Sequence, residues 1–294
     1  MGKGFEAIRY FLATIVTAVW LFPLFWWFLT SFKPYSALFT REPVYIFKPT
    51  FDWWKVVLTG IPPWAEELKK TGAIVGEAGG WFYAVPYLLN SIIIATATSI
   101  LTLLASSYVA YGLSRFDFKH KSDLLFIILS FRFLPPIAVV IPYYLVWTAL
   151  KLTDTHIGLI LLYWIMNMGL GILLMKSYFD DIPRAIDEAA MLDGASRFKI
   201  FWRLIMPATK AGLAATFVIL FLFSWDEFLM ALVLTWKVAR TLPVAASTYV
   251  TAYGTEWGMI AAVGNLALIP VAILSILTSR YLGRGMAMGL VKGA

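Results

Sequence analysis

Three charged side chains lie inside long apolar stretches of this sequence and are its first candidates for chemistry: Arg132, Asp226 and Glu227. A charge in an apolar environment is costly unless it forms an ion pair or is hydrated. Two interpretations stay open. Arg132 forms an ion pair with Asp226 or Glu227 that holds two helices together, or these residues line a water-filled path and contact a polar solute. Both can hold, because neighbouring residues of a helix point about 100° apart.

The sequence lacks the residue types of most other functional sites. It contains no cysteine, which excludes disulfides, thiolate metal sites and cysteine nucleophiles. Its two histidines, His120 and His156, are far apart in the chain and cannot build a histidine-rich metal site. It has no Gly-x-x-x-x-Gly-Lys-Ser/Thr loop for binding ATP. We therefore expect no catalytic residue, no metal and no cofactor in this chain.

The composition is that of a membrane protein. Hydrophobic residues make up 61% of the 294 residues and charged residues only 14%, and the mean hydropathy is +0.78. A helix needs roughly 20 apolar residues to cross a hydrocarbon core of about 30 Å. We predict an all-α polytopic membrane protein whose residues 1–294 form a single transmembrane domain with six transmembrane helices. The predicted spans are approximately 10–31, 87–113, 124–150, 157–175, 211–236 and 257–279.

The distribution of Lys and Arg between these spans predicts the orientation of the chain. If the N-terminus is cytoplasmic, fourteen of the 24 basic residues lie in inner segments and nine in outer ones, as the positive-inside rule requires. Both termini are then cytoplasmic, residues 32–86 form an outer loop, and residues 176–210 form a cytoplasmic hairpin between the fourth and fifth helices. The net charge of +7 reflects this bias, so no nucleic-acid partner is expected.

The third predicted span contains a helix break. Arg132 is followed by Phe133-Leu134-Pro135-Pro136, and prolines remove backbone donors from a helix. Irregular backbone at membrane depth is tolerated where it lines a cavity or is buried in protein. We predict that the candidate substrate pathway runs past this break and the middle of the fifth span. Its candidate residues are Arg132, Asn167, Asp226 and Glu227.

The stretch between the fourth and fifth spans has the sequence of a helical hairpin. Pro183 can open a helix, and the carboxylates of Asp187 and Glu188 in its early turns favour the positive end of the helix dipole. Gly194 supplies the left-handed conformation that ends a helix. Ser196 can cap the basic helix that follows. The hairpin is charged and solvent-facing, between two apolar spans.

From Glu188 to Pro207 this hairpin resembles the EAA loop of bacterial and archaeal ABC importer permeases. The family pattern is Glu-Ala-Ala, three residues, Gly, nine residues, Ile, one residue, Leu-Pro; Leu204 and Met206 are apolar replacements within it. The resemblance implies a short helix that docks into a cleft on a cytoplasmic ATPase and carries its ATP-driven movement into the membrane. The residues that it assigns to ATPase coupling are Glu188, Ala189, Ala190, Asp193, Gly194 and Pro207.

Other fragments resemble the maltose-type carbohydrate permeases, and in particular the smaller of their two permease partners. These fragments are 31–34, 90–91, 110–115, 225–228 and 289–293. The resemblance implies a multi-pass permease subunit of an ATP-driven importer in the inner membrane, a transport subunit rather than an enzyme. It would form the path for a carbohydrate or related polyol. One departure is Asp226, where the family usually has Asn.

The same resemblance implies the partners of the chain. They are a second, homologous permease subunit, two cytoplasmic ATP-binding subunits, an extracytoplasmic substrate-binding protein that lands on the outer loop, and membrane lipid. In the family the C-terminal tail reaches into the ATPase dimer. Carried over to this chain, that contact falls on Leu290, Val291 and Lys292.

Three alternatives differ in the features they require. A membrane enzyme needs a convergent set of acid, base or nucleophile, and only Arg132, Asp226 and Glu227 qualify. An ion-coupled secondary transporter usually has an internal repeat; the two halves show none, and such a carrier has no need for the cytoplasmic hairpin. An ABC permease for a non-sugar solute is the third alternative, because selectivity can reside mostly in the binding protein and in the other permease.

Overall fold

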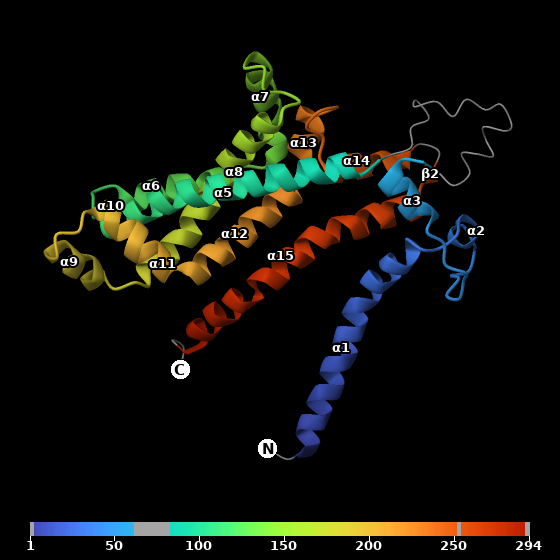
Figure 1. Ribbon diagram of the computed structural model, residues 1–294, viewed down its shortest axis with the longest axis horizontal. Coiled ribbons are helices and arrows are strands. Elements are labelled where there is room, and N and C mark those ends of the chain that lie inside the picture. Colours follow the sequence, from blue (N-terminus) through green and yellow to red (C-terminus); the bar gives the residue numbers. More distant parts are fainter. Residues whose placement is uncertain (1–2, 62–82, 252–253, 292–294) are drawn as a thin grey trace. The chain divides into compact units, whose positions relative to one another are not determined.

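The structure is a computed structural model that describes residues 3–61, 83–251 and 254–291. The chain forms two compact units (Figure 1). Unit 1 consists of Met1–Pro86 with Ala245–Ile269, and unit 2 of Tyr87–Val244 with Pro270–Ala294. The fold is mostly helical, as predicted. The exception within the described residues is an antiparallel pair of two-residue strands, β1 (Val250–Thr251) and β2 (Gly254–Thr255), in which Val250 pairs with Thr255.

Four described helices are long and apolar enough to cross a membrane, and they cover four of the six predicted spans. The helices are α1 (Lys3–Thr30), α5 (Val85–Arg115), α8 (His156–Asp180) and α15 (Trp257–Val291). The bent pair Arg197–Ala208 and Lys210–Trp225 makes a fifth if it counts as one span. Long apolar sequence is sufficient to specify these helices because every backbone group must be paired inside a membrane.

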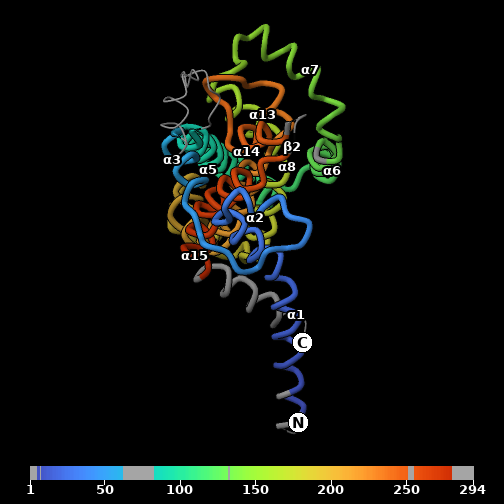
Figure 2. Tube along the Cα trace, turned by 90° about the vertical axis from the view of Figure 1, so that its right-hand side faces the viewer, coloured from blue at the N-terminus to red at the C-terminus, as the bar shows by residue number. Residues whose placement is uncertain are grey.

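The third predicted span is divided, as the sequence around Arg132 predicts. Its parts are α6 (Lys121–Ser130), the short 3-10 helix η1 (Phe131–Phe133) and α7 (Pro136–Ala149). Leu134 and Pro135 are extended and separate the two helices. Figure 2 shows α6 and α7 running in different directions from this break. The cause is local, because a residue before proline avoids the helical conformation.

Unit 1 is built around an aromatic cluster. Its other helices are α2 (Tyr35–Leu38) and α3 (Asp52–Thr59). The indole of Trp53 is buried, donates a hydrogen bond of 2.7 Å to the carbonyl of Lys33 and lies against Gly258, where a Cβ would come within 2.3 Å of the ring. The Lys33 ammonium lies 3.6 Å from the ring centre of Trp26, and burial lowers the pKa of Lys33. The outer-loop segment 62–82, with its predicted Pro and Gly turns, lies outside the described residues.

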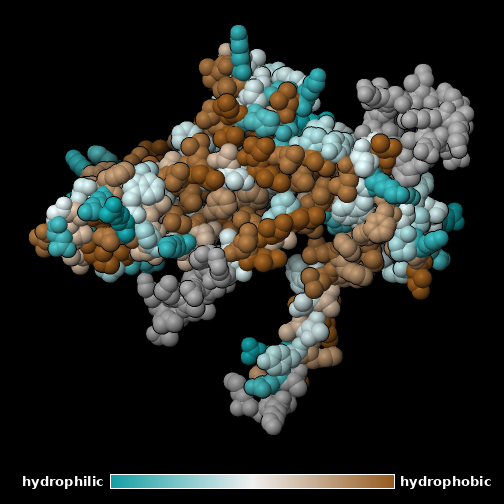
Figure 3. All heavy atoms as spheres, viewed as in Figure 1, coloured by the Kyte–Doolittle hydropathy of each residue, from teal (hydrophilic) through white to brown (hydrophobic). Residues whose placement is uncertain are grey.

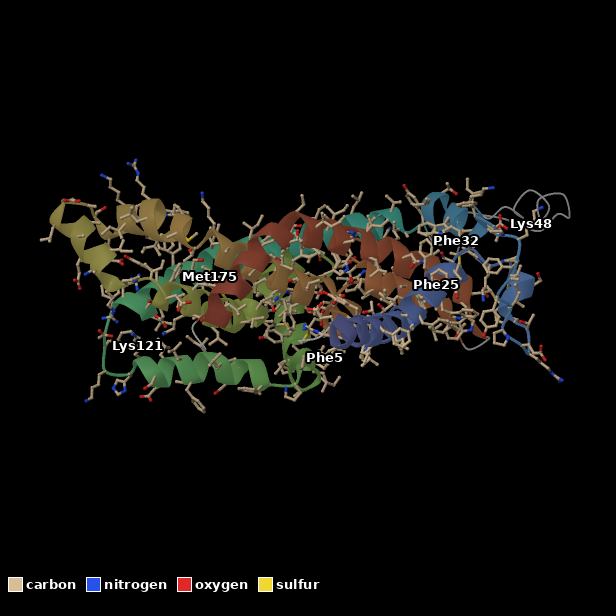
Figure 4. The ribbon with its side chains drawn as sticks, turned by 90° about the horizontal axis from the view of Figure 1, so that it is seen from below. Phe5, Phe25, Phe32, Lys48, Lys121 and Met175 are labelled. Atoms are coloured by element: carbon tan, nitrogen blue, oxygen red, sulfur yellow. The ribbon has the colours of Figure 1, made fainter. Side chains whose placement is uncertain are left out.

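Unit 2 is a bundle in which α5 and α8 approach closely. The buried face of α5 is lined by small polar residues: Ser91, Thr98, Ser99, Thr102, Ser106 and Ser107. Gly171 of α8 faces Ser106, and a Cβ at Gly171 would come within 2.7 Å of the Ser106 hydroxyl. Small residues allow membrane helices to pack this closely. Met175 of α8 is fully buried in this bundle, whereas Lys121 lies at its edge (Figure 4).

An unpredicted set of polar contacts fixes the loop 235–241 of unit 2. This loop follows α13 (Leu229–Leu234) and leads into α14 (Leu242–Ala246). The carboxylate of Asp154 accepts hydrogen bonds of 3.0 to 3.2 Å from the backbone amides of residues 236–239. Burial opposes ionisation of Asp154, but these amides outweigh it and lower the pKa of the carboxyl. Asn90 donates to the carbonyls of Val238 and Arg240.

Candidate functional site

The hairpin helix α9 (Arg184–Leu192) has the ends that its sequence predicts. Pro183 is its N-cap residue. After the helix, Gly194 has a φ of 80°, and its amide donates 3.0 Å to the carbonyl of Met191 while the amide of Ala195 donates 3.0 Å to that of Ala190. These two hydrogen bonds form a Schellman motif, which satisfies carbonyls at a helix end and turns the chain. The predicted glycine cap is confirmed.

The second arm of the hairpin consists of short helical segments. Ser196 caps α10 (Arg197–Ile200) by accepting from the amide of Lys199, as predicted. A π-helical turn, η2 (Phe201–Ile205), and the short α11 (Met206–Ala208) follow. The chain then bends by 80° before α12 (Lys210–Trp225). Pro207 therefore lies in α11, ahead of the bend.

One face of α9 is open to solvent and mixes charge with apolar surface. Glu188, Ala189, Asp193 and Gly194 are exposed. Leu192 is 90% exposed, and Phe198 of α10 and Ile186 are exposed beside these polar residues. Figure 3 shows hydrophilic and hydrophobic side chains together at this end of unit 2. An exposed mixture of this kind is typical of a surface that binds another protein.

The opposite face of α9 is held by a buried ion pair that the sequence analysis did not single out. Asp187 is buried, and its Oδ2 lies 3.0 Å from Nε of Arg115, with exposed side-chain fractions of 5% and 3%. The hydroxyl of Tyr111 donates a hydrogen bond of 2.9 Å to Oδ1 of Asp187. Arg115 also donates 3.1 Å to the carbonyl of Phe179 in α8. Asp187 therefore connects α9 to the end of α5.

A second, exposed contact joins the start of α9 to the same end of α5. Arg184 donates hydrogen bonds of 2.8 and 3.3 Å to the carboxylate of Asp117 and one of 3.0 Å to the carbonyl of Ser114. The hydrogen bonds from Arg184 and then from Lys121 lower the pKa of the Asp117 carboxyl to about 2. Asp117 is therefore ionised at any physiological pH.

The hairpin 176–210 packs onto the rest of unit 2 through a hydrophobic cluster. It joins Ala110 and Tyr111 of α5 and Met175 and Phe179 of α8 to the second arm of the hairpin. From that arm come Ile200, Phe201, Ile205 and Met206, with Ala190 and Ala195 at the margin. Ala190, predicted to face a partner, is half-buried in this contact instead of fully exposed.

The two adjacent carboxylates near the end of α12 have different surroundings. Glu227 accepts hydrogen bonds from the buried hydroxyl of Tyr163, at 2.7 Å, and from the amides of Met230 and Ala231, at 2.9 and 3.1 Å. It therefore caps α13 and ties it to α8. Asp226 is exposed, and none of the described side chains donates a hydrogen bond to its carboxylate.

The remaining pathway candidates are only partly placed. Asn167 is buried in α8 and donates 3.1 Å to the hydroxyl of Ser224, two residues before Asp226. The backbone of Arg132 lies in η1, but its side chain is outside the described residues, so its pairing stays a prediction. Leu290 and Val291 end α15, and Lys292 lies outside the described residues. Among the side chains that are described, no group of three or more His, Asp or Glu could hold a metal ion.

Comparison with known proteins decides the family. Residues 104–288, which include the whole hairpin, match the model of the binding-protein-dependent transport system inner membrane component. The chain belongs to this family of inner-membrane ABC transporter permeases. The permease is therefore a multi-pass transport subunit and not an enzyme, and it works with ATPase subunits and a binding protein. This membership confirms the resemblance carried by Glu188–Pro207.

Individual relatives cover nearly all of the permease. It is 32% identical to the probable ABC transporter permease protein y4oR of Sinorhizobium fredii over 95% of this chain and 92% of that protein. It is 29% identical to the trehalose/maltose transport system permease protein MalG of Thermococcus litoralis, over 96% and 95%. A subunit of a bacterial ABC transporter involved in alginate import has the same fold, with a TM-score of 0.70 at 20% identity, over 96% and 99%.

Proposed function

We propose that this permease forms part of the translocation path for a carbohydrate or related polyol that an extracytoplasmic binding protein delivers. Relatives of nearly equal length carry trehalose/maltose and arabinooligosaccharide transport in their names, and alginate, the named substrate of the structural neighbour, is also a carbohydrate. Uptake of labelled sugars and polyols by the reconstituted complex tests this. Transport of only a non-sugar solute would contradict the substrate class and leave the membership of the family intact.

We propose that α9 couples ATP hydrolysis to transport through its exposed face. The observation that carries this proposal is the orientation of α9: Asp187 is buried against α5, while Glu188, Ala189, Asp193 and Gly194 face outward. The Schellman motif at Gly194 sets the direction in which the second arm leaves, and Pro207 precedes the 80° bend into α12. Movement of α9 therefore reaches α12 through a short, packed segment.

The variant Gly194→Val tests the coupling role. A left-handed conformation costs an L-residue with a Cβ about 1–2 kcal/mol, so valine at a φ of 80° should redirect the second arm. We expect transport to fall while the permease still inserts into the membrane. Gly194→Asn is the matched control, because asparagine tolerates this conformation, and it should retain most transport. Wild-type transport by Gly194→Val, with normal ATPase assembly, would show that α9 is not the coupling element.

We propose that residues 1–294 act as one transmembrane domain with six spans and cytoplasmic termini. The family match runs through parts of both units, and the basic residues favour this orientation. Because the chain has no cysteine, single cysteines report the side directly. Lys199→Cys should react with a membrane-impermeant maleimide only from the cytoplasmic face and Lys237→Cys only from the outer face. Labelling of Lys199→Cys from outside would contradict the topology.

We propose that a second, homologous permease covers α1 and completes the path. The described part of the chain buries none of residues 8–29 of α1. The hydrophobic side chains of this helix point to all sides: Phe11, Ile15, Trp20 and Phe22 are all exposed. Lipid alone can solvate such a helix. Six spans, however, are few for an alternating-access path, which favours a second permease as the partner of α1. We also propose, from the family alone, that Leu290, Val291 and Lys292 contact the ATPases.

We propose that the substrate path passes Asp226, with Asn167 and Arg132 near it. None of the described side chains donates a hydrogen bond to this exposed carboxylate, and a charge at this position is costly unless water, a solute or an opposite charge reaches it. Glu227, by contrast, is engaged by Tyr163 and the start of α13, so its contribution is to the shape of the path.

A further inference from the structure

The buried polar cluster behind α9 is formed by Tyr111 and Arg115 of α5 and Asp187 of α9. The side chains of all three are buried, and Tyr111 and Arg115 lie four residues apart, on the same side of α5. Asp187 precedes Glu188, the first residue of the exposed coupling face. The cluster therefore joins the back of the docking helix to one side of one transmembrane helix.

Stability does not explain a charged pair at this position. Two charges lose their hydration when they are buried, and an apolar pair of similar volume often holds two helices as well or better. The hydrophobic cluster around Phe179 and Ile200 already attaches the hairpin to the bundle. The ion pair and the Tyr111 hydrogen bond instead fix the orientation of α9 relative to α5, because they restrict both the distance and the angle between the two helices.

We propose that Tyr111, Arg115 and Asp187 form a transmission link that carries the movement of α9 directly into α5. Arg115 is the last residue of α5, which continues without interruption for 31 residues to Val85. A displacement applied at Arg115 therefore acts along the whole helix. Asp187 is a positioning residue in this account, since it faces away from the docking surface and acts through Arg115.

The link reaches a third helix as well. Nη1 of Arg115 donates to the carbonyl of Phe179 in the last turn of α8, where a cation also favours the negative end of the helix dipole. Arg115 thus joins the cytoplasmic ends of α5 and α8 to α9. Asn167 and Tyr163, which hold Ser224 and Glu227, lie farther along α8. A movement of α8 therefore acts on Ser224 and Glu227, which lie beside Asp226 on the proposed path.

This inference rests on the proposed coupling role of α9, and its test uses the complete complex with ATPases and binding protein. Transport and ATP hydrolysis are measured on the same reconstituted samples, together with the amount of assembled complex. In Asp187→Asn we expect ATP hydrolysis within about twofold of wild type, with solute moved per ATP reduced about fivefold or more, in the usual range of coupling between sites. Tyr111→Phe, which removes one hydroxyl, should show a smaller loss of the same kind.

Two further variants separate transmission from attachment. The triple variant Tyr111→Phe, Arg115→Met, Asp187→Leu replaces the cluster by apolar side chains, so assembly should return to wild type, while solute moved per ATP stays low. Asp117→Asn breaks the exposed contact with Arg184, and exposed ion pairs contribute little. This control should change transport by less than about twofold.

The outcomes distinguish the two proposals. Recovery of solute moved per ATP in the triple variant, or an equal loss in Asp117→Asn, would show that the cluster only attaches the hairpin. If Gly194→Val uncouples the complex and Asp187→Asn does not, the transmission link is wrong and the coupling role of α9 stands. If neither variant changes solute moved per ATP, α9 itself is not the coupling element.

Discussion

At the scale of single residues, identical chemistry has different roles at adjacent positions. Asp226 and Glu227 are both carboxylates in an apolar segment. Glu227 accepts from Tyr163 and from two amides at the start of α13, whereas Asp226 is exposed. The relevant difference is the supply of donors. Three donors make Glu227 a structural group, whereas none of the described side chains donates a hydrogen bond to Asp226.

We therefore predict that neutralising Glu227 affects stability and that neutralising Asp226 affects transport. Glu227→Gln should lower the free energy of unfolding by about 1.5–3 kcal/mol, because hydrogen bonds to a charged acceptor are the stronger kind. Asp226→Asn, which restores the usual family residue, should leave stability unchanged and alter the rate or selectivity of transport. Thermal unfolding of the solubilised permease and uptake kinetics measure the two effects. A stability loss confined to Asp226→Asn would indicate a buried partner for Asp226, for which Arg132 is the candidate.

At the scale of helices, glycines determine which pairs can approach. Gly212 of α12 faces the ring of Tyr178 in α8, and a Cβ at this position would lie 2.4 Å from the ring carbon Cγ. Cγ is held close to the backbone of α8, so the ring cannot move away freely. A Cβ at Gly112 of α5, in contrast, would have no atom of a neighbouring segment within 4 Å.

Alanine substitution of these two glycines should therefore have opposite signs. Gly212→Ala should destabilise the permease by about 1–3 kcal/mol, the usual cost of overpacking. Gly112→Ala should be neutral or stabilising by up to about 1 kcal/mol, because alanine has the better helix propensity. Unfolding of both variants in the same detergent compares them directly. Equal stability of Gly212→Ala and wild type would mean that α8 and α12 do not pack through this glycine.

At the scale of the whole molecule, the described residues leave apolar surface that none of them buries. None of residues 8–29 of α1 is buried, and Leu192 and Phe198 are exposed near Glu188, Ala189 and Asp193. The first surface requires an apolar partner or lipid, and the second a soluble protein surface. Both requirements fit a permease that functions only inside a larger complex.

We predict that native mass spectrometry of the gently solubilised complex will detect one copy of this chain, one different permease and two ATPases. The spans of one chain are few for a path of alternating access, which calls for a second permease. The resemblance to maltose-type systems, which use two unequal permeases, predicts that it is a different chain. Two copies of this chain with two ATPases, and no second permease, would reject the heterodimer. Expression without the ATPase subunits is the control. The permease pair should then be detected without ATPases on its hairpins.

The sequence by itself determined the local features of this protein. Long apolar runs specified α1, α5, α8 and α15 because a membrane leaves a helix as the means of pairing its backbone. Gly194 and Ser196 specified the ends of the hairpin helices because caps depend on residues within a few positions of one another. Pro135 and Pro136 predicted the break in the third span for the same reason. The family pattern from Glu188 to Pro207 also lies within one short segment.

Only the tertiary structure decided which distant side chains meet. Asp187 and Tyr111 are 76 residues apart, and Glu227 and Tyr163 are 64 apart. Nothing local distinguishes Asp187 from Glu188, yet one is buried against Arg115 and the other is exposed. Their roles depend on the side of α9 that packs against α5, and that side is set by the close packing of helices brought together from separate parts of the chain. Short-range sequence patterns carry no information on that contact.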